Sequence, residues 1–324
     1  KILEGTNDTG ITERALRYDL TIPFARYVSM NYNKLTMPYK RYQMQSVWRA
    51  DRPQKGRYRE FFQCDADVAG TNSLISDAEL INIYIAVFEK LKIPKVNYTS
   101  EPNGYSININ NRKILTALAE ICERTDILTE ITTVIDKIDK IGIVKVKEEL
   151  SQRGLSHHQI GLIEEYLSIV GRYNEDILLQ LEKLLGHNEH GRKGIEELRF
   201  ITNHIPPEDF IQIKASLARG LNYYTGLIVE VKMPHSFQIG SIGGGGRYDD
   251  LTGLFGLPNI PGVGISFGVD RIYDVMNELD IFPAEINKST TVLFFNMGEK
   301  ESIFAFEQMQ ALRNNGISCE LFYE

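Results

Sequence analysis

Polar and apolar residues alternate in two neighbouring stretches near the N-terminal end of the chain. Between residues 41 and 49, and again between residues 59 and 68, the repeat is two residues, which is typical of β-strands with one apolar face and one polar face. The intervening DRPQKGRY contains Pro53 and Gly56, which mark a turn, and it concentrates basic side chains at its tip. The pattern predicts a β-hairpin whose polar face carries Arg41, Gln43, Gln45 and Arg49 from the first strand and Arg59, Phe61, Gln63, Asp65 and Asp67 from the second.

Two interpretations of this polar face stay open from the hairpin alone. A polar face is costly to bury without partners, so it either faces water or holds a ligand. Arginine binds phosphate oxygens in a planar fork, and Phe61 offers a flat surface to a base, so the residue types favour a ligand. The alternative is a solvated edge hairpin whose charges prevent aggregation.

Helical patterns surround this hairpin. Residues 15 to 20 predict a short strand ending near Asp19, followed by a helix that Thr21 caps, with Pro23 in its first turn. Apolar spacing predicts a helix over 73–92, and Pro102 to Gly104 predict the turn of a β-hairpin. Residues 111 to 204 indicate several short helices, which we interpret as an insertion. The histidines of that region lack metal-ligand spacing, and no metal site is expected.

Strand patterns return in the C-terminal half. Residues 210 to 231 predict a twisted hairpin that breaks at Arg219, with Tyr223 and Tyr224 starting its second strand. The run QIGSIGGGGRYDDLTG predicts a strand, a glycine turn and a helix start, with space for a ligand against the backbone. It lacks the Gly-Lys-Ser/Thr of a phosphate-binding P-loop and the GxGxxG of a dinucleotide site.

The last stretches predict one more strand and helix and then a separate piece. GVGISFGVDRIYDVMNEL predicts a buried strand and an amphipathic helix, and Arg271 in its first turn lies where a triphosphate meets a helix N-terminus. Residues 283 to 288 form a predicted linker. Residues 291 to 322 predict a strand, a helix and a strand, the start of an α/β domain.

Composition narrows the class of protein. With 324 residues and 43% hydrophobic content, the chain can form one large or two medium domains. The net charge of −7 argues against nucleic-acid binding by bulk charge, so any RNA contact must use local basic patches. Three distant cysteines argue against a disulfide framework and favour a reducing cytoplasm. No apolar run is long enough to span a bilayer, and we expect no membrane association.

Four blocks in order resemble one family. WRADRPQKGRYREFFQ is similar to motif 2 of class II aminoacyl-tRNA synthetases as found in histidyl-tRNA synthetases, and LARGLNYYTG is similar to a stretch specific to that family. GGGRYD and GVGISFGVDR resemble the segment bordering the amino-acid site and motif 3. RYDLT with QCDADVAG resembles the branch shared with eukaryotic-type enzymes, where many bacterial members carry RPEGT and a glutamate.

The resemblance implies an α+β fold built on the antiparallel β-sheet of class II synthetases, flanked by helices. It divides the chain into a first part of the catalytic core with the motif 2 hairpin (1–110), a helical insertion (111–208), a second part of the core with the histidine-specific stretch and motif 3 (209–282), and the start of the anticodon-binding domain (283–324). Motif 1, which builds the family's dimer interface, is not among these residues, so a homodimer is expected from the family alone.

The resemblance also implies the reaction and the residues that serve it. Histidine and ATP form histidyl-adenylate, Mg²⁺ accompanies ATP, and the histidyl group then passes to tRNA(His). Arg49 and Arg219 are the implied catalytic residues. Histidine would contact Asp19, Thr21, Gln63, Asp67, Tyr223 and Tyr224. ATP would contact Arg49, Arg57, Arg59, Phe61 and Arg271.

Two other functions stay open. A synthetase-like regulatory subunit of ATP phosphoribosyltransferase, in histidine biosynthesis, has the same fold but no need for the arginines that handle phosphate. A nucleic-acid-binding accessory protein on this fold would bind RNA or DNA without forming an adenylate, and the acidic balance of the chain argues against it.

Overall fold

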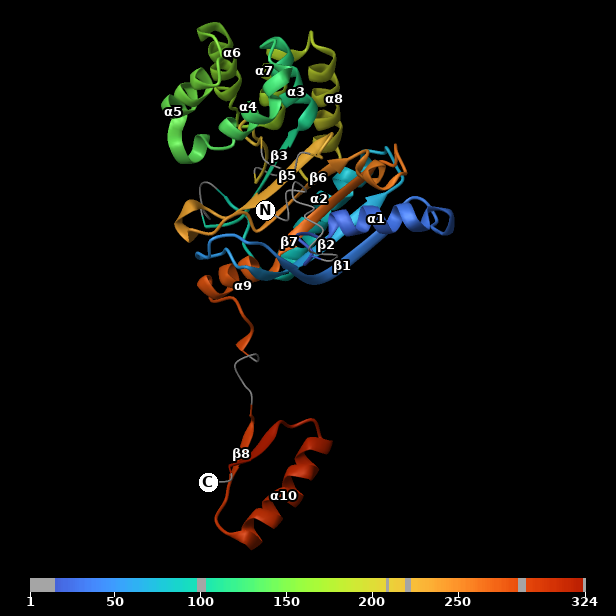
Figure 1. Ribbon diagram of the computed structural model, residues 1–324. Coiled ribbons are helices and arrows are strands. Elements are labelled where there is room, and N and C mark those ends of the chain that lie inside the picture. Colours follow the sequence, from blue (N-terminus) through green and yellow to red (C-terminus); the bar gives the residue numbers. More distant parts are fainter. Residues whose placement is uncertain (1–14, 98–102, 208–209, 219–222, 285–289, 323–324) are drawn as a thin grey trace. The chain divides into compact units, whose positions relative to one another are not determined.

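A twisted sheet organises the first of two units into which the chain divides, Lys1–Glu278 and Leu279–Glu324 (Figure 1). The computed structural model describes residues 15–97, 103–207, 210–218, 223–284 and 290–322. Within them the sheet has seven strands in the order β1-β2-β7-β6-β5-β3-β4. The strands are β1 (Tyr39–Trp48), β2 (Glu60–Ala69), β3 (Ser106–Asn111), β4 (Ile211–Ile213), β5 (Leu227–Lys232), β6 (Gly243–Tyr248) and β7 (Gly262–Gly268). Every neighbouring pair is antiparallel except β3 and β4, which confirms the predicted fold class.

One face of this sheet is covered by an aromatic layer. Helix α2 (Ile75–Lys90) contributes Tyr84 and Phe88, which contact Phe267 of β7 with ring centroids 4.7 and 5.8 Å away. Tyr84 also donates its hydroxyl to the carbonyls of Gly244 at 3.0 Å and Ser266 at 2.8 Å. Large buried rings of this kind supply much of a core's stabilisation, and here they leave the opposite face of the central strands for the site.

The predicted hairpin is confirmed, but its two faces are used in an unexpected way. β1 and β2 pair from Tyr39 opposite Ala69 to Trp48 opposite Glu60. On the apolar face the exposed fractions of Tyr42, Met44 and Phe62 are 81%, 62% and 51%. On the polar face those of Gln63, Asp65 and Asp67 are 8%, 3% and 2%. The interpretation of a solvated polar face is therefore wrong for β2, whose polar groups are buried.

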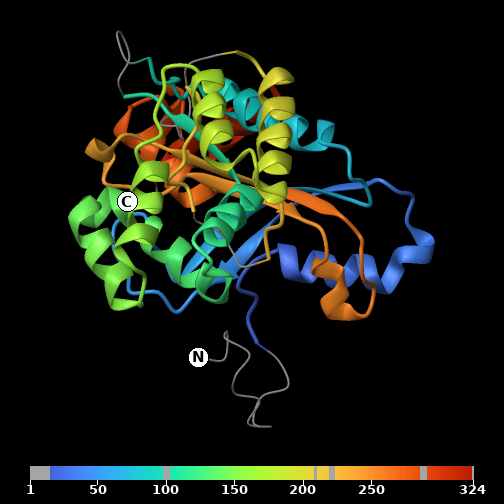
Figure 2. The same ribbon diagram turned by 90° about the horizontal axis from the view of Figure 1, so that it is seen from above.

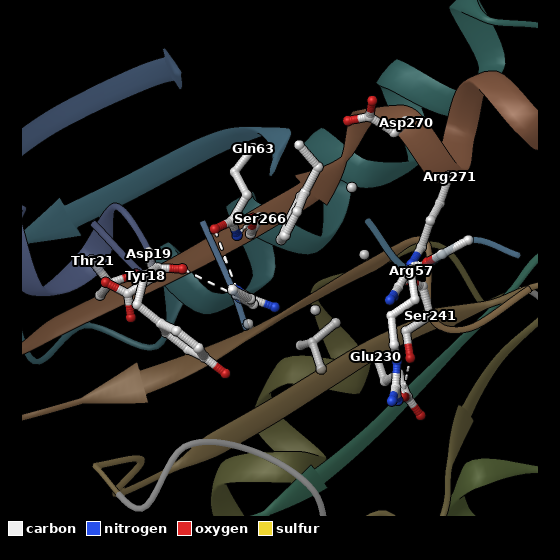
Figure 3. Close-up of a pocket in the computed structure, with 18 of the residues that line it drawn as sticks. Tyr18, Asp19, Thr21, Arg57, Gln63, Glu230, Ser241, Ser266, Asp270 and Arg271 are labelled. Carbon is white, nitrogen blue, oxygen red and sulfur yellow. Dashed lines mark hydrogen bonds between the residues drawn. The ribbon is translucent and has the colours of Figure 1, made fainter. Parts of the chain in front are cut away.

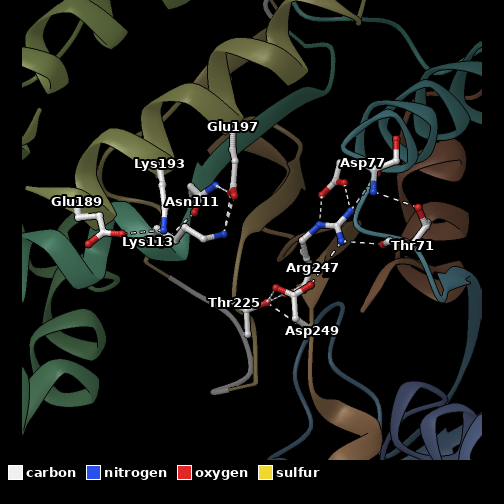
Figure 4. A network of polar contacts seen from close by, with 11 residues as sticks. Thr71, Asp77, Asn111, Lys113, Glu189, Lys193, Glu197, Thr225, Arg247 and Asp249 are labelled. Carbon is white, nitrogen blue, oxygen red and sulfur yellow. Dashed lines mark hydrogen bonds and ion pairs between the residues drawn. The ribbon is translucent and has the colours of Figure 1, made fainter. Parts of the chain in front are cut away.

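The predicted helical insertion is a group of helices beyond β3 (Figures 1 and 2). These helices are α3 (Arg112–Ile121), α4 (Leu128–Ile135), α5 (Ile138–Gln152), α6 (His157–Leu167), α7 (Asn174–Leu185) and α8 (Glu189–Asn203), and the 3₁₀ turn η3 (Thr125–Ile127) lies among them. The 3₁₀ turns outside the insertion are η2 (Tyr32–Lys34), η4 (His235–Phe237) and η5 (Leu251–Phe255). Glu197 of α8 fastens the group to the end of β3, accepting hydrogen bonds from Asn111 Nδ2 and Lys113 Nζ, both at 2.7 Å (Figure 4). The insertion is thereby anchored to the strand from which it departs.

The segment before the first helix differs from its prediction. Residues 15 to 20 form no strand, and α1 (Thr21–Asn31) has Leu20 at its N-cap, with no side-chain cap bond from that residue. Instead Asp19 Oδ1 accepts the amide of Ile22 at 3.1 Å. The Asp19 carboxylate, one residue before the N-cap Leu20, thus satisfies a free amide of the first turn. The prediction that Thr21 caps the helix was wrong.

The four-glycine run was predicted as a turn and is a strand in the middle of the sheet. β6 pairs with β5 on one side and β7 on the other. A Cβ on Gly243 would lie 2.7 Å from the Tyr84 ring, and one on Gly245 would lie 2.2 Å from the Gly264 carbonyl oxygen. The close approach of the Tyr84 ring at Gly243 and of the β7 backbone at Gly245 therefore leaves no room for a side chain. The helix start predicted after it is also wrong, since the 3₁₀ turn η5 follows.

Of the two other predicted hairpins, one is absent from the described residues, and the turn of the other, at Pro102, lies outside them. Residues 210 to 231 supply β4 and β5, which flank β3 on opposite sides and do not pair with each other. Tyr223 and Tyr224 precede β5 without belonging to it. Ahead of β3, Lys95 forms only an isolated bridge with Tyr105, and β3 takes its partners from β4 and β5. Long-range pairing with later strands overrides the local turn signals.

The remaining elements agree with the prediction. α9 (Val269–Glu278) directly follows β7. In the second unit, β8 (Val292–Phe295), α10 (Glu299–Asn314) and β9 (Cys319–Phe322) form a strand-helix-strand piece with parallel strands. Its core contains Ala305, Met309, Cys319 and Leu321. Of the helices in the described residues, none has the length and apolar character needed to cross a membrane.

Candidate active site

A cavity of about 360 Å³ lies on the polar face of the sheet (Figure 3). Its floor follows one row of cross-strand neighbours, because the strand register brings residues far apart in the sequence side by side. The members of this row that line the cavity are Ser266 of β7, Gly244 of β6 and Glu230 of β5. Gly243, Gly244, Gly245 and Gly268 also line the cavity. On β6 it is Gly244 whose missing side chain leaves volume on the cavity side for a small ligand, because a Cβ on Gly243 would meet Tyr84 on the opposite face.

One end of the cavity has a dense set of neutral and acidic groups. Asp19, Thr21, Gln63, Tyr223 and Tyr224 all line it, although they come from the start of α1, from β2 and from the segment before β5. The two tyrosine rings meet edge to face with centroids 5.1 Å apart. Gln63 Nε2 donates to Ser266 Oγ at 2.6 Å, which fixes the amide against β7. This end presents hydrogen-bonding groups around a flat slot.

A second layer of charge lies directly behind that end. The guanidinium of Arg41 on β1 faces its cross-strand neighbour Asp67, with Nη2 2.9 Å from Oδ2, and Tyr248 donates its hydroxyl to Asp67 Oδ1 at 2.6 Å. Burial raises the pKa of Asp67 to about 6, although Arg41 and Tyr248 oppose the rise. Burial and the charge of Asp67 raise the pKa of Asp65 to about 7. Burial also raises the pKa of Asp19, against the Ile22 amide and the charge of Arg49.

The other end of the cavity is cationic. Arg57 and Arg271 line it together, with Ser241 and Glu230 beside them (Figure 3). Arg271 donates Nε to the Gly56 carbonyl at 2.5 Å and Nη1 to the Ser241 carbonyl at 2.6 Å, so its orientation is fixed by backbone from two distant segments. Guanidinium groups held in this way are suited to phosphate oxygens.

Arg49 lies between two aromatic rings at the mouth of the hairpin. Its guanidinium carbon is 4.5 Å from the centroid of Tyr18 and 4.9 Å from that of Phe61. It also donates Nε to the Tyr18 carbonyl at 3.3 Å and Nη2 to Gln63 Oε1 at 3.4 Å. Arg49 and Phe61 line the cavity together with Gln63, so the guanidinium of Arg49 is held beside the acidic end.

The basic tip of the hairpin is held against α9. Tyr58 donates its hydroxyl to Asp274 at 2.7 Å, and Lys55 pairs with Glu278 at 3.0 Å. Asp270, at the start of α9, accepts the Phe62 amide at 2.8 Å. The loop 51–59 is therefore fastened to α9 at two points and the start of β2 at a third, and the loop forms a wall of the cationic end.

Most of the predicted site residues come together in this cavity. Its lining includes Asp19, Thr21, Arg49, Arg57, Phe61, Gln63, Tyr223, Tyr224 and Arg271. Arg59 is exposed and not part of the lining, and Asp67 lies in the layer behind it. Arg219 lies outside the described residues. The roles predicted for these three residues stay predictions.

Sequence reasoning missed several polar groups at the cavity. Glu230, with an exposed fraction of 3%, is the carboxylate beside the cationic end, where it accepts a hydrogen bond from Ser241 and pairs with Lys232 at 2.8 Å. A lone carboxylate inside the apolar run LIVEV was the signal that could have found it. The cavity is also lined by Ser266, Asp270 and Tyr18. The sequence alone does not show this, because it depends on the strand register and on the position of α9.

The arginine of GGGRYD points away from the cavity. Arg247 donates Nε to Asp77 Oδ1 at 3.1 Å and pairs with the other carboxylate oxygen of Asp77, and it also donates to the Thr71 and Ser73 carbonyls, both at 3.2 Å (Figure 4). This buried pair ties β6 to the N-terminal end of α2. The glycines of the segment border the cavity, while its arginine supports the fold.

Comparison with known proteins gives consistent matches. A family model described as Histidyl-tRNA synthetase matches residues 7–272. A protein named histidine--tRNA ligase from Christiangramia forsetii is 50% identical over 318 residues, covering 97% of this chain and 68% of that protein. One of the same name from Bacteroides fragilis is 49% identical, covering 96% and 66%. The crystal structure of histidyl-tRNA synthetase from Nostoc sp. PCC 7120 superposes with a TM-score of 0.78 at 32% identity, covering 96% of this chain and 70% of that one. The chain thus spans about two thirds of the length of these relatives.

Proposed function

Because the chain belongs to the histidyl-tRNA synthetase family, we propose that it activates histidine with ATP and transfers the histidyl group to the 3′ end of tRNA(His). One observation carries the proposal: a single cavity joins a slot lined by Asp19, Tyr223 and Tyr224 to a cationic end lined by Arg57 and Arg271. An amino acid and a nucleoside triphosphate require these two environments side by side.

The reaction asks the protein mainly for positioning and charge neutralisation. In the first step a carboxylate oxygen of histidine forms a bond to the α-phosphorus of ATP, and the bond between that phosphorus and the bridging oxygen breaks, releasing pyrophosphate. In the second step a hydroxyl of the terminal ribose of tRNA attacks the histidyl carbonyl carbon, and AMP leaves. Neither step requires a covalent bond to the enzyme.

Each cavity residue has a proposed task in this reaction. Arg49 would neutralise the α-phosphate and the attacking carboxylate, and its position between the rings of Tyr18 and Phe61 supports this role. Arg219 is proposed to have the same role. Arg57, Arg59 and Arg271 would bind the outer phosphates or adenine, with Phe61 stacking on the base. Asp19, Thr21 and Gln63 would bind the α-amino group. Tyr223, Tyr224 and Asp67 would bind the imidazole.

The selection of histidine follows from buried hydrogen bonds to both ring nitrogens. An isosteric side chain without those nitrogens would leave the pocket's polar groups unpaired, which costs up to about 10⁴-fold in discrimination. The burial of Asp67 and the tyrosine pair beside it support such a pocket, since unmet hydrogen bonds are most costly away from water.

The residues at the cationic end fit a magnesium ion that arrives with ATP. Mg²⁺ is commonly bound by one or two carboxylates together with substrate phosphates and water. Glu230 supplies one buried carboxylate there, and the described residues contain no cluster of three or more His, Cys, Asp or Glu side chains that would form a separate metal site. Glu230 would hold the ion, which would supply charge neutralisation on the phosphates.

The partners and the location belong to the same proposal. We propose tRNA(His) as the acceptor, a homodimer as the assembly and the cytoplasm as the compartment, following the family. We further propose that residues 1–110 and 209–282 form the catalytic core, that 111–208 is an insertion over the acceptor end of tRNA, and that 283–324 begins the anticodon-binding domain. The uncovered apolar faces of Leu293, Phe295 and Phe322 on β8 and β9 support the last assignment, because parallel strands are normally covered on both faces.

Histidine-dependent exchange of labelled pyrophosphate into ATP tests the function directly. We expect exchange with histidine and none with the other amino acids, and a loss of about 10²-fold or more in kcat/KM for Arg49→Ala, as for removal of a group that stabilises transition-state charge. Arg26→Ala, an exposed arginine of α1, is the matched control. Binding of histidine without any exchange would instead favour the alternative of a regulatory subunit of ATP phosphoribosyltransferase. The 50% identity to a histidine--tRNA ligase argues against that alternative.

A further inference from the structure

Arg41 contacts several groups behind the acidic end of the cavity, although the sequence predicted no role for it there. Its side chain has an exposed fraction of 9%, and its guanidinium pairs with Asp67 at 2.9 Å. The same Nη2 donates to the carbonyl of Leu20 at 2.9 Å, and Nη1 donates to the side chain of Gln43. The Phe24 ring of α1 lies beneath it, with the centroid 4.3 Å away. Arg41 therefore connects β1, β2 and the start of α1.

The Leu20 contact matters because of its neighbours in the chain. Leu20 stands between Asp19 and Thr21, which both line the cavity. Its exposed fraction is 0%, and its carbonyl holds this segment to β1 together with the carbonyls of Arg17 and Tyr18, which accept from Trp48 N and Arg49 Nε. A single guanidinium thus reaches both the segment that carries Asp19 and the strand that carries Asp67. Arginine suits this task because its planar fork serves two acceptors at once, which a lysine ammonium on a flexible stem does not.

Arg41 is the cation paired with Asp67, while Asp19 faces both Arg49 and Arg41. Asp19, Asp65 and Asp67 have exposed fractions of 7%, 3% and 2%. One oxygen of Asp65 makes no hydrogen bond within the described residues. The groups around Asp67 are Arg41 on β1, Asp65 on β2, Tyr248 on β6, Asp19 before α1, and Tyr223 and Tyr224 before β5. Without the guanidinium, the carboxylates would repel each other in a medium that already disfavours charge.

We propose that Arg41 is a positioning residue of the histidine site: it keeps the Asp67 carboxylate ionised and holds the Asp19–Thr21 segment against the sheet. Arg41 does not line the cavity, and it acts on the substrate through Asp67 and the Leu20 carbonyl. The inference rests on the proposed function, since it assigns the acidic end to histidine.

Arg41→Gln tests the proposal in the full chain through the pH profile of the histidine KM. Without the guanidinium the pKa of Asp67 rises, so at pH 6.5 more of this carboxylate is protonated than in the wild type, while at pH 8.5 it is ionised again. We expect the ratio of variant to wild-type histidine KM to be about threefold at pH 6.5, as a one-unit rise of a pKa near 6 gives, and close to one at pH 8.5. The ratio cancels the titration of histidine itself. The KM for ATP should stay within about twofold.

Two further variants separate positioning from a merely structural role. Arg41→Lys keeps the charge but cannot bind both acceptors, so it should raise the histidine KM by about threefold at both pH values, as loss of a neutral hydrogen bond does. In Arg41→Gln with Asp65→Asn, removal of one carboxylate should bring the histidine KM back toward the wild type. Arg26→Gln is the matched control on α1.

The outcomes that overturn the proposal are distinct from those that overturn the function. Wild-type exchange together with unchanged histidine KM and pH profiles in the Arg41 variants rejects the positioning role alone. Equal loss at both pH values in Arg41→Gln, with no recovery in the double variant, also rejects it, because a structural defect would behave in that way. If Arg41→Gln does not fold, Arg41→Lys decides. A wild-type chain that neither binds histidine nor exchanges pyrophosphate rejects both the function and this inference.

Discussion

Asp67 is the residue on which the proposed amino-acid specificity depends most directly. It lies behind the cavity lining, yet it contributes to the electrostatic environment of both Tyr223 and Tyr224, and burial together with this negative charge raises the pKa of each phenol. Its own oxygens are held by Arg41 and Tyr248. A carboxylate fixed in this way costs no reorganisation when a ligand NH arrives, which is the advantage of a preorganised site.

We therefore expect Asp67→Ala to raise the KM for histidine by about 10²-fold or more, in line with the 2–5 kcal/mol lost when a buried charge loses its partner. The KM for ATP should change little, because Arg57 and Arg271 lie at the other end of the cavity. Steady-state pyrophosphate exchange measures both constants, and Glu60→Ala on the same strand is an exposed control. An unaltered histidine KM would remove Asp67 from the pocket.

Asp65 gives a prediction about stability rather than binding. Its pKa in the folded chain is about 7, mainly because of burial, whereas an unfolded aspartate titrates near 3.8. Below the unfolded pKa both states are protonated and the group has no effect. As the pH rises toward 7 the unfolded state ionises first, so the folded state loses stability through this group, and above the folded pKa the loss is complete.

Asp65→Asn removes that titration while keeping the shape of the side chain. The difference in free energy of unfolding between variant and wild type should therefore grow in favour of the variant from pH 5 to pH 8, by about 2 kcal/mol. Urea denaturation at the two pH values measures it. A difference that does not depend on pH, or one that favours the wild type at pH 8, would show that Asp65 ionises normally in the fold.

At the scale of elements, β6 shows why part of the site was hidden from the sequence. Four glycines carry no alternation of polar and apolar side chains, so the period of a strand is invisible in them, and their local signal is that of a turn. Only the layers on either side, Tyr84 on one face and the cavity on the other, reveal the strand. Glu230 was missed for a related reason, since its neighbours across the sheet come from β3 and β6.

The hairpin of β1 and β2 was predicted well because its side chains alternate clearly and Pro53 and Gly56 mark the turn between the strands. Four motif residues, Arg49, Arg57, Phe61 and Gln63, line the cavity, and their roles there stay predictions. The motif could not predict that Arg59 lies outside the cavity lining. The attachment of the loop to α9 decides which of its basic side chains point into the cavity. Sequence motifs identified the members of the site better than their orientation.

The two faces of β6 give a matched pair of substitutions. A Cβ on Gly243 would lie 2.7 Å from the buried Tyr84 ring, whereas one on Gly244 would meet its nearest atom at 3.5 Å and project toward the cavity. Gly243→Ala should destabilise the fold by about 1–3 kcal/mol, as overpacking does. Gly244→Ala should leave stability nearly unchanged and raise the KM for histidine or ATP. Thermal unfolding and exchange kinetics on both variants test this, and the reverse assignment would contradict the strand register.

For the whole molecule, we infer from the division into two units that amino-acid activation belongs to the first unit alone. All residues that line the cavity belong to the unit Lys1–Glu278, and the piece formed by β8, α10 and β9 has a small core of its own. Apolar side chains on one face of β8 and β9 are exposed, which supports the proposal that 283–324 begins a domain.

A chain ending at residue 282 should consequently keep histidine-dependent pyrophosphate exchange within about threefold of the full chain in kcat/KM, because a change below 1 kcal/mol is expected for residues that do not contact the site. Its transfer of histidine to tRNA(His) should fall much further, since the proposed anticodon contacts begin in the removed part. The comparison needs a folded truncated chain, which circular dichroism and a cooperative thermal transition establish. Loss of exchange in a folded chain of 282 residues would mean that the second unit supports the catalytic cavity, and the proposed division of labour would be wrong.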